Sequence, residues 1–302
     1  ELVWRFLERA RESGGRASFY QVRPQTLPVY LDAGLRVFKL GEEAYVPLPE
    51  FSLKGKNRGN LRTGYNRAER EGLSFELIQP MLEAEGHTVI APDLPGMGGT
   101  DEELAAATLA NWADYVSELC ISAAKPVILC GHSRGGLVLS ETAERIPKDI
   151  AALVYICAMM LPSGMSREQW RDRAEPNPAF RALVQPHPSG IATIIDRSHA
   201  APVFAQLSPP DLVEKAFDRL MAEPDQPRLT ELNLSQARYG SVPRHYIECV
   251  HDKTIPISDQ RMMQSLQPCL SVTSLDADHS PFLSRPRELA DALLKIAAEI
   301  DA

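Results

Sequence analysis

A serine, an aspartate and a histidine, each at the end of a predicted strand, are the residues of this 302-residue sequence best suited to chemistry. Ser133 lies in the pentapeptide GHSRG, directly after an apolar run and before an amphipathic segment. Asp252 follows the apolar run 245–250, and His279 follows the run 269–275. A serine hydroxyl is a useful nucleophile only when a base takes its proton and an acid orients that base. The order predicts Ser133 as nucleophile, His279 as base and Asp252 as orienting acid.

The glycines around Ser133 predict a strained strand-to-helix turn with the serine at its tip. Gly131 and Gly135 put small residues where such a turn crowds the backbone. The alternative is a glycine-rich turn with an incidental serine.

Two of these assignments have other rivals in the sequence. Asp276 and Asp278 compete with Asp252 for the role of the acid, but both are too near His279 in sequence to orient its ring. For His279 the alternative is a surface histidine without a catalytic role.

Other polar clusters predict no cofactor and no metal site. The glycines of GMGG at residues 96–99 resemble a phosphate loop, but a dinucleotide fingerprint needs glycine where Asp101 stands, so we interpret them as a turn. The remaining histidines have no zinc-binding spacing. The basic stretch 54–70 is interpreted as a solvated helix face rather than a site for nucleic acid or anionic lipid.

Short apolar runs alternate with amphipathic segments from residue 87 onward, which is typical of βα units around a mostly parallel sheet. The predicted strands are residues 87–94, 126–130, 151–158, 245–250 and 269–275. The predicted helices are residues 75–85, 104–123, 135–145 and 286–300. Residues about 161–243 lack this rhythm but contain helical patches such as 211–221, so they predict a helical cap rather than a long irregular loop.

The charge balance changes near residue 74. Residues 1–74 hold 13 Lys/Arg against 9 Asp/Glu, whereas residues 75–302 hold 19 against 31. The first part predicts an α+β fragment, and its expected elements are a helix at 2–11, strands at 18–22 and 35–40, and a basic helix or coil at 55–71. We therefore expect two domains, 1–74 and 75–302.

The composition is that of a globular protein, with 44% hydrophobic and 24% charged residues. The longest apolar run, residues 151–161, is shorter than the roughly 20 residues that a membrane span needs. No signal peptide is recognised, and the five cysteines lie mostly in apolar runs. We expect a cytoplasmic protein with reduced thiols. Because the chain starts at Glu1, upstream residues are expected to be missing.

Four motifs carry a family resemblance over residues 75–302: APDLPGMG at 91–98, GHSRGG at 131–136, HYIECVHDK at 245–253 and DHSPF at 278–282. They resemble the salicylate-binding methylesterase and hydroxynitrile lyase group of α/β-hydrolases and its bacterial relatives. The resemblance implies a doubly wound sheet with a helical cap, and a triad at Ser133, Asp252 and His279. The lyases have lysine directly after the histidine; here Ser280 favours the esterase branch.

The first 74 residues resemble a different family. The motifs FYQV at 19–22, YLDAGL at 30–35, KLGEEA at 39–44, FSLKGK at 51–56 and NRAEREG at 66–72 are similar to the C-terminal domain of bacterial phosphatidylglycerol lysyltransferases. Only a fragment of that domain is present, and it stops where the hydrolase resemblance begins.

The junction between the two resemblances removes a piece of the hydrolase. In that family a central strand and a His-Gly loop precede the helix represented by residues 75–85, and this chain has no His-Gly there. The loop supplies one oxyanion-hole N–H, and the amide after the nucleophile, here Arg134, supplies the other. Losing one such donor costs about 2.7–4 kcal/mol of transition-state stabilisation. A substitute strand, for instance 35–40 or 44–48, would have to fill the place between residues 87–94 and 127–130.

Three functional hypotheses follow. The first is a serine carboxylesterase that cleaves small-molecule esters through an acyl-enzyme. The second is a fused or mis-assembled chain without catalytic activity, suggested by the missing loop and the truncated second family. The third, aminoacyl transfer to lipid, is disfavoured because the fragment is too short for a complete acyltransferase core. The sequence gives neither the substrate nor the oligomeric state.

Overall fold

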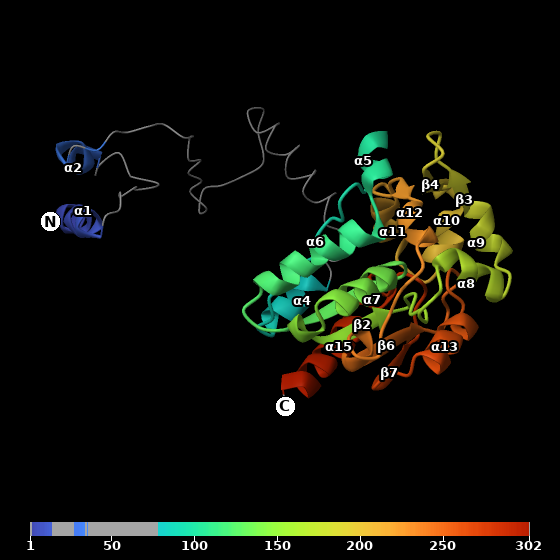
Figure 1. Ribbon diagram of the computed structural model, residues 1–302. Helices are drawn as coiled ribbons and strands as arrows, with labels where there is room; N and C mark the ends of the chain where they lie inside the picture. Colours follow the sequence, from blue (N-terminus) through green and yellow to red (C-terminus); the bar gives the residue numbers. More distant parts are fainter. Residues whose placement is uncertain (1, 14–26, 34, 36–77, 302) are drawn as a thin grey trace. The chain divides into compact units, whose positions relative to one another are not determined.

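Four parallel strands form the sheet on which the candidate site is built (Figure 1). Their order is β1-β2-β6-β7, with β1 (Val127–His132), β2 (Ile150–Ile156), β6 (Arg244–Cys249) and β7 (Ser271–Leu275). Because the strands are parallel, their carboxyl ends meet at one edge of the sheet. The prediction of a mostly parallel α/β sheet is confirmed.

The computed structural model describes residues 2–13, 27–33, 35 and 78–301. The chain divides into two compact units, residues 1–59 and 60–302. The first contains the expected helix, α1 (Leu2–Glu12), and a short helix that the sequence did not predict, α2 (Leu27–Asp32). The expected elements at 18–22, 44–48 and 55–71, and all but residue 35 of 35–40, lie outside the described residues.

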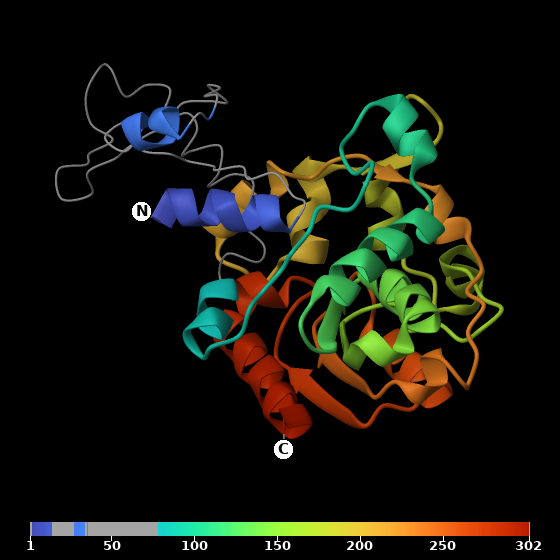
Figure 2. The same ribbon diagram turned by 60° about the vertical axis from the view of Figure 1, so that its left-hand side comes forward.

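Helices cover both faces of the sheet, which explains why β2 is apolar along its whole length. On one face, Leu153 and Tyr155 of β2 pack with α6 and α7; on the other, Val154 and Ile156 pack with α15. Figures 1 and 2 both show α6 and α7 side by side. Each fully buried side chain of this size stabilises the fold by about 1.5–3 kcal/mol.

Helix ends follow local capping signals. The predicted helix 104–123 is two helices, α5 (Asp101–Ala106) and α6 (Leu109–Ser122), because Thr100 and Thr108 each begin a capping box. Helix α4 (Gln79–Ala84) ends at Gly86, which has a φ of +89°, as expected for a C-terminal glycine.

The remaining helices include those predicted after the nucleophile and at the end of the chain. The bounds are α7 (Gly135–Arg145), η4 (Pro147–Asp149), η5 (Tyr239–Ser241), α13 (Ile257–Leu266), α14 (Pro281–Ser284) and α15 (Pro286–Asp301). None of the helices in the described ranges is both long and apolar enough to cross a bilayer.

The cap inserted between β2 and β6 contains helices and a small sheet. Its helices are α8 (Arg167–Arg173), α9 (Pro178–Leu183), α10 (Arg197–Phe204), α11 (Pro210–Phe217) and α12 (Gln226–Leu229). Its antiparallel sheet has the order β3-β4-β5, with β3 (Val184–Pro186), β4 (Ala192–Ile195) and β5 (Glu223–Pro224). The sequence did not predict this sheet because strands of two to four residues give no periodic pattern.

The strand predicted at residues 87–94 is wrong. The segment has no regular structure, and Ile90 is 64% exposed. Its apolar composition predicted a strand, but within the described part of the chain no strand lies beside it to complete a ladder. Among the described residues, β1 pairs with β2 alone. Residues Val127–Cys130 of β1 are only partly buried, whereas most residues of β2 are fully buried.

Candidate active site

Ser133 directly follows β1 and has a φ of +53°, a backbone conformation that costs a non-glycine residue energy. Two backbone hydrogen bonds hold it there: Ser133 N–H donates to Ile156 O at 3.3 Å, and Met159 N–H donates to Ser133 O at 2.9 Å. The strained turn that the sequence predicted is therefore present, and β2 supports it.

The glycines of this turn differ in how closely they are packed. A Cβ on Gly131 would overlap Leu139 Cδ1 and lie 2.9 Å from the Gly135 carbonyl carbon. A Cβ on Gly136 would overlap the Met159 carbonyl oxygen, whereas one on Gly135 meets open space. The predicted crowding is correct for Gly131 and wrong for Gly135, because the backbone approaches Gly136 instead.

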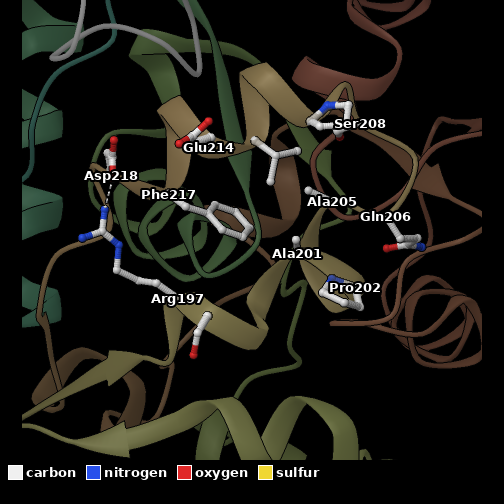
Figure 3. A pocket seen from close by; sticks show the side chains of 12 residues that line it. Arg197, Ala201, Pro202, Ala205, Gln206, Ser208, Glu214, Phe217 and Asp218 are labelled. Atoms are coloured by element: carbon white, nitrogen blue, oxygen red, sulfur yellow. Dashed lines mark hydrogen bonds and ion pairs between the residues drawn. The ribbon is translucent and has the colours of Figure 1, made fainter.

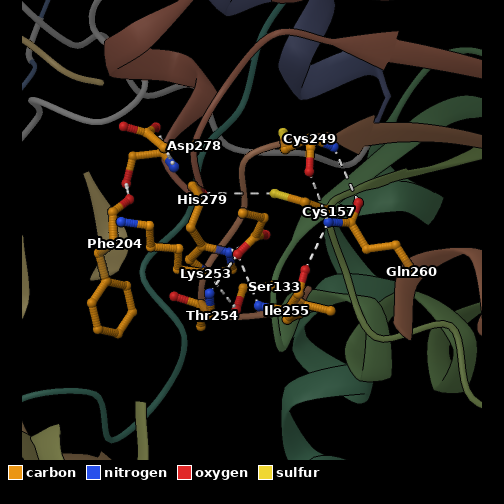
Figure 4. Close-up of polar contacts among 12 residues, drawn as sticks. Ser133, Cys157, Phe204, Cys249, Lys253, Thr254, Ile255, Gln260, Asp278 and His279 are labelled. Atoms are coloured by element: carbon orange, nitrogen blue, oxygen red, sulfur yellow. Dashed lines mark hydrogen bonds and ion pairs between the residues drawn. The ribbon is translucent and has the colours of Figure 1, made fainter. Parts of the chain in front are cut away.

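The three predicted residues form a continuous chain of hydrogen bonds. His279 Nε2 lies 3.0 Å from Ser133 Oγ, and both residues are labelled in Figure 4. His279 Nδ1 lies 2.7 Å from Asp252 Oδ2. The other Asp252 oxygen accepts the N–H groups of Thr254 and Ile255, at 2.7 and 2.8 Å. The side chain of Asp252 is fully buried and that of His279 is 2% exposed. A buried carboxylate fixed in this way holds the imidazole with Nε2 facing the serine.

Neither rival carboxylate contacts the His279 ring. Asp278 is buried and accepts four hydrogen bonds, from Leu207 N, Ser208 Oγ, Ser280 N and Ser284 Oγ. Asp276 is on the surface, where it pairs with His251 at 2.6 Å and Arg285 at 3.3 Å. Asp278 thus joins the cap loop to the histidine loop, a role that sequence spacing could not indicate.

His132 is a further residue of the site, and its sequence context predicted no role for it. Its Nε2–H donates to the His279 carbonyl oxygen at 2.7 Å, and the two rings lie 4.6 Å apart. Burial and the neighbouring His279 lower the pKa of His132 to about 3, so the ring is neutral at ordinary pH. We interpret His132 as a positioning residue that fixes the backbone of His279.

Helix α7 begins at the site and turns its N-terminal end toward it. Arg134 is the N-cap residue of this helix, so its amide belongs to the end whose N–H groups lack helical acceptors. These groups and the helix dipole favour an anion beside Ser133.

A cavity of about 850 Å³ opens above Ser133 and His279, between the sheet and the cap. Trp170, Phe180 and Phe204 contribute apolar wall from the cap. A second hollow, of about 880 Å³, lies between α10 and α11 around the Arg197–Asp218 ion pair (Figure 3). It contains none of the three triad side chains, so we place the site in the first cavity.

His132, Cys157 and His279 offer three potential metal-ligand atoms within 4.8 Å of one another. Both ring nitrogens of His279 already contact Asp252 and Ser133. Burial holds the pKa of the Cys157 thiol well above its usual range, so the thiolate that binds metal is disfavoured. We therefore interpret these three residues as His279 of the triad with two buried neighbours, and not as a metal site.

Comparison with known proteins agrees with this geometry. The model of the Alpha/beta hydrolase family matches residues 64–292. The chain belongs to this family. An α/β-hydrolase places its nucleophile, acid and histidine in this chain order at the ends of strands, as Ser133, Asp252 and His279 are placed here.

Relatives of this α/β-hydrolase include a pyrethroid hydrolase of Sphingobium wenxiniae, 33% identical over 76% of this chain and 85% of the relative. Salicylic acid-binding protein 2 of Nicotiana tabacum is 32% identical over 75% of this chain and 92% of that protein. The solved structure of polyneuridine aldehyde esterase superposes with a TM-score of 0.65 at 27% identity, covering 74% of this chain and 93% of that one. The predicted methylesterase group is confirmed.

The N-terminal resemblance is also confirmed. The model of the C-terminal part of phosphatidylglycerol lysyltransferase matches residues 1–89. It overlaps the hydrolase match over residues 64–89. The domain boundary between residues 74 and 75 stays a prediction.

Proposed function

We propose that this α/β-hydrolase is a carboxylic-ester hydrolase that cleaves small esters through an acyl-enzyme on Ser133. The observation that carries the proposal is the hydrogen-bonded chain from Ser133 through His279 to buried Asp252, at the floor of a cavity. Relatives named as a pyrethroid hydrolase and as methylesterases support ester cleavage. The proposal needs neither a metal nor an organic cofactor.

In the acylation step, Ser133 Oγ attacks the ester carbonyl carbon while its proton passes to His279 Nε2. The negative charge moves to the carbonyl oxygen, which the Arg134 amide and the N-terminal end of α7 stabilise. The C–O bond to the alcohol then breaks, and the alcohol leaves with the proton held by His279. Asp252 stabilises the transient imidazolium without taking its proton.

Deacylation repeats the same chemistry with water. His279 takes a proton from water, the oxygen attacks the acyl carbon, and the bond to Ser133 Oγ breaks as His279 returns the proton to the serine. The products are a carboxylic acid and an alcohol, and the triad is restored. The 3.0 Å separation of Nε2 and Oγ suits this transfer in both directions.

The second candidate is a fused chain with little or no catalysis. The observation in its favour is that β1, within the described residues, has a partner on one side only. Without a second oxyanion donor, acylation would be about a hundredfold to a thousandfold slower. We propose the division into residues 1–74 and 75–302 as the junction of this fusion.

Labelling of the full chain with a fluorophosphonate probe tests the triad. We expect labelling of the wild type, its loss in Ser133→Ala, and its retention in Ser265→Ala, which changes an exposed serine of α13. Asp252→Asn should lower the kcat for a p-nitrophenyl ester by roughly 10³–10⁴-fold, because the wrong histidine tautomer is then favoured. Asp276→Asn, on the surface, should change it less than about twofold.

Circular dichroism confirms that each variant is folded. Labelling that persists in Ser133→Ala would refute Ser133 as nucleophile. A folded wild type that neither reacts with the probe nor turns over esters would support the inactive fusion.

A further inference from the structure

The cavity above Ser133 is lined by an unusual number of cations for an acidic domain. Six arginines contribute to its wall: Arg134, Arg167, Arg171, Arg181, Arg219 and Arg228. Four carboxylates, Asp93, Glu175, Glu223 and Asp259, contribute as well. Residues 75–302 as a whole hold 19 Lys/Arg against 31 Asp/Glu. The positive wall is therefore a local feature of the cavity.

Three of these arginines already have carboxylate partners. Arg134 pairs with Glu223, Arg171 pairs with Glu168, and Arg228 bridges Glu168 at 2.7 Å and Asp225 at 2.9 Å. The Arg134–Glu223 pair joins the turn that carries Ser133 to strand β5 of the cap, whereas the other pairs lie within the cap.

Arg167, at the start of α8, differs from them. Across residues 2–13, 27–33, 35 and 78–301, no carboxylate comes within 4.0 Å of its guanidinium. The side chain is nevertheless part-buried and lies near Arg134, Arg171 and Arg228. Burial lowers the pKa of Arg167, and Arg171, Arg228 and Arg181 lower it further, while the neighbouring carboxylate of Glu168 offsets part of this effect. The charge of Arg167 is therefore held at a cost that an anion in the cavity would relieve.

A continuous aromatic wall connects Arg167 to the catalytic histidine. The Phe204 ring lies edge-on to His279, with centroids 5.6 Å apart, and the Phe180 ring lies 5.8 Å from Phe204. The Arg167 guanidinium lies over Phe180, 5.7 Å from its centroid. A substrate with its ester carbonyl at Ser133 and an apolar body along these two rings would bring its far end to Arg167.

We propose that the preferred substrate carries a carboxylate at its far end, separated from the ester by an apolar spacer, and that Arg167 binds this carboxylate. The inference rests on the proposed esterase function and names its substrate class. A guanidinium suits the role because its planar N–H groups pair with both oxygens of a carboxylate. Two kinds of ester fit: a half-ester of a dicarboxylic acid, and an ester whose alcohol carries the carboxylate.

Matched pairs of esters test the proposal with the full chain. For the acid side, the mono-p-nitrophenyl ester of adipic acid is compared with its neutral analogue, in which an isopropyl group replaces the carboxylate. For the alcohol side, p-acetoxybenzoate is compared with p-isopropylphenyl acetate. We expect the anionic member of one pair to have a kcat/KM about tenfold to a hundredfold above its neutral partner, mainly through a lower KM.

Arg167→Met should abolish this preference, so that the anionic and the neutral member of each pair then have equal kcat/KM values. Arg173→Met is the matched control, because Arg173 is an exposed residue of the same helix that does not line the cavity. Raising the ionic strength should reduce the preference in the wild type and leave Arg167→Met unaffected. Equal kcat/KM values within both pairs, or a preference that survives Arg167→Met, would overturn the proposal while leaving the esterase function intact.

A binding measurement separates failure of the inference from failure of the esterase function. Calorimetry with monomethyl adipate and with p-acetoxybenzoate is done on Ser133→Ala and on Ser133→Ala combined with Arg167→Met. At least tenfold weaker binding of one ligand to the double variant supports carboxylate recognition even if the wild type proves inactive. Equal binding of both ligands to the two proteins contradicts it.

Discussion

At the scale of single residues, the site separates groups that react from groups that hold them. Ser133, His279 and Asp252 could be predicted because each follows an apolar run that predicts a strand, and parallel strands end at one edge of a sheet. His132 and Asp278 could not be assigned their roles in this way. Their roles come from contacts with a backbone carbonyl and with cap groups far away in sequence.

His132 makes the stability of the fold depend on pH, independently of the protonation of the triad. Its pKa is about 3 in the fold, against an ordinary value of 6.5. Between pH 3 and pH 6.5, His132 is protonated in the unfolded chain but not in the folded chain. The free energy of unfolding therefore falls as the pH falls from 6.5 toward 3. Above pH 6.5 His132 is neutral in both states, so this loss of stability is absent.

We expect His132→Gln to reduce this acid sensitivity, because glutamine keeps an N–H for the His279 carbonyl and does not titrate. Between pH 7 and pH 4 the wild type should lose about 2 kcal/mol more stability than the variant, less than full burial would give because His132 is only partly buried. Urea unfolding across this range measures the difference. His199→Gln, at an exposed histidine, should follow the wild type, and a His132→Gln curve parallel to the wild type would contradict the assignment.

At the scale of elements, the turn between β1 and α7 is the part of the site that local sequence predicted best. An apolar strand, a glycine pair and an amphipathic helix predicted it, and α7 has the predicted bounds. The cap was predictable only as an insertion, since its strands are too short to show a period. The strand predicted at residues 87–94 is wrong for a different reason: an apolar run forms a strand only where a neighbouring strand pairs with it, and none of the described strands does so.

The two adjacent glycines of α7 give a matched test of the turn. Gly136→Ala forces a methyl group against the Met159 carbonyl oxygen. Because the Met159 N–H donates a hydrogen bond to the Ser133 carbonyl oxygen, a shift of Met159 should also move the strained serine. We expect a loss of about 1–3 kcal/mol in unfolding free energy and a fall in kcat of at least tenfold.

Gly135→Ala, one residue earlier, meets open space and replaces a glycine inside a helix. It should leave stability unchanged or raise it by up to about 1 kcal/mol. Thermal unfolding and ester turnover measured on both variants decide the matter. Equal losses in the two variants would show that the Met159 contact is not what constrains the turn.

At the scale of the whole molecule, two family resemblances meet where an α/β-hydrolase has a central strand of its sheet. Sequence motifs located both families, because each motif is local, while the missing His-Gly loop stays a prediction. They could not determine what lies beside β1, because strand pairing depends on segments that are distant in sequence and carry no shared motif. Within the described residues β1 pairs with β2 alone, so its other side is the place to test.

Hydrogen exchange measured residue by residue on the full chain tests that edge. In a parallel sheet, alternate amides of a strand point to opposite neighbours, and β2 has β1 and β6 on its two sides. If no segment pairs with the other side of β1, the amides of β1 that point away from β2 should exchange at least tenfold faster than the amides of β2. Uniform protection along β1 would show instead that a further segment is paired with it. Such a segment would end beside Ser133, where the hydrolase fold requires its second oxyanion donor, and ester turnover should then approach that of a complete site. With an open edge, the Arg134 amide acts alone and turnover should be lower by about a hundredfold to a thousandfold.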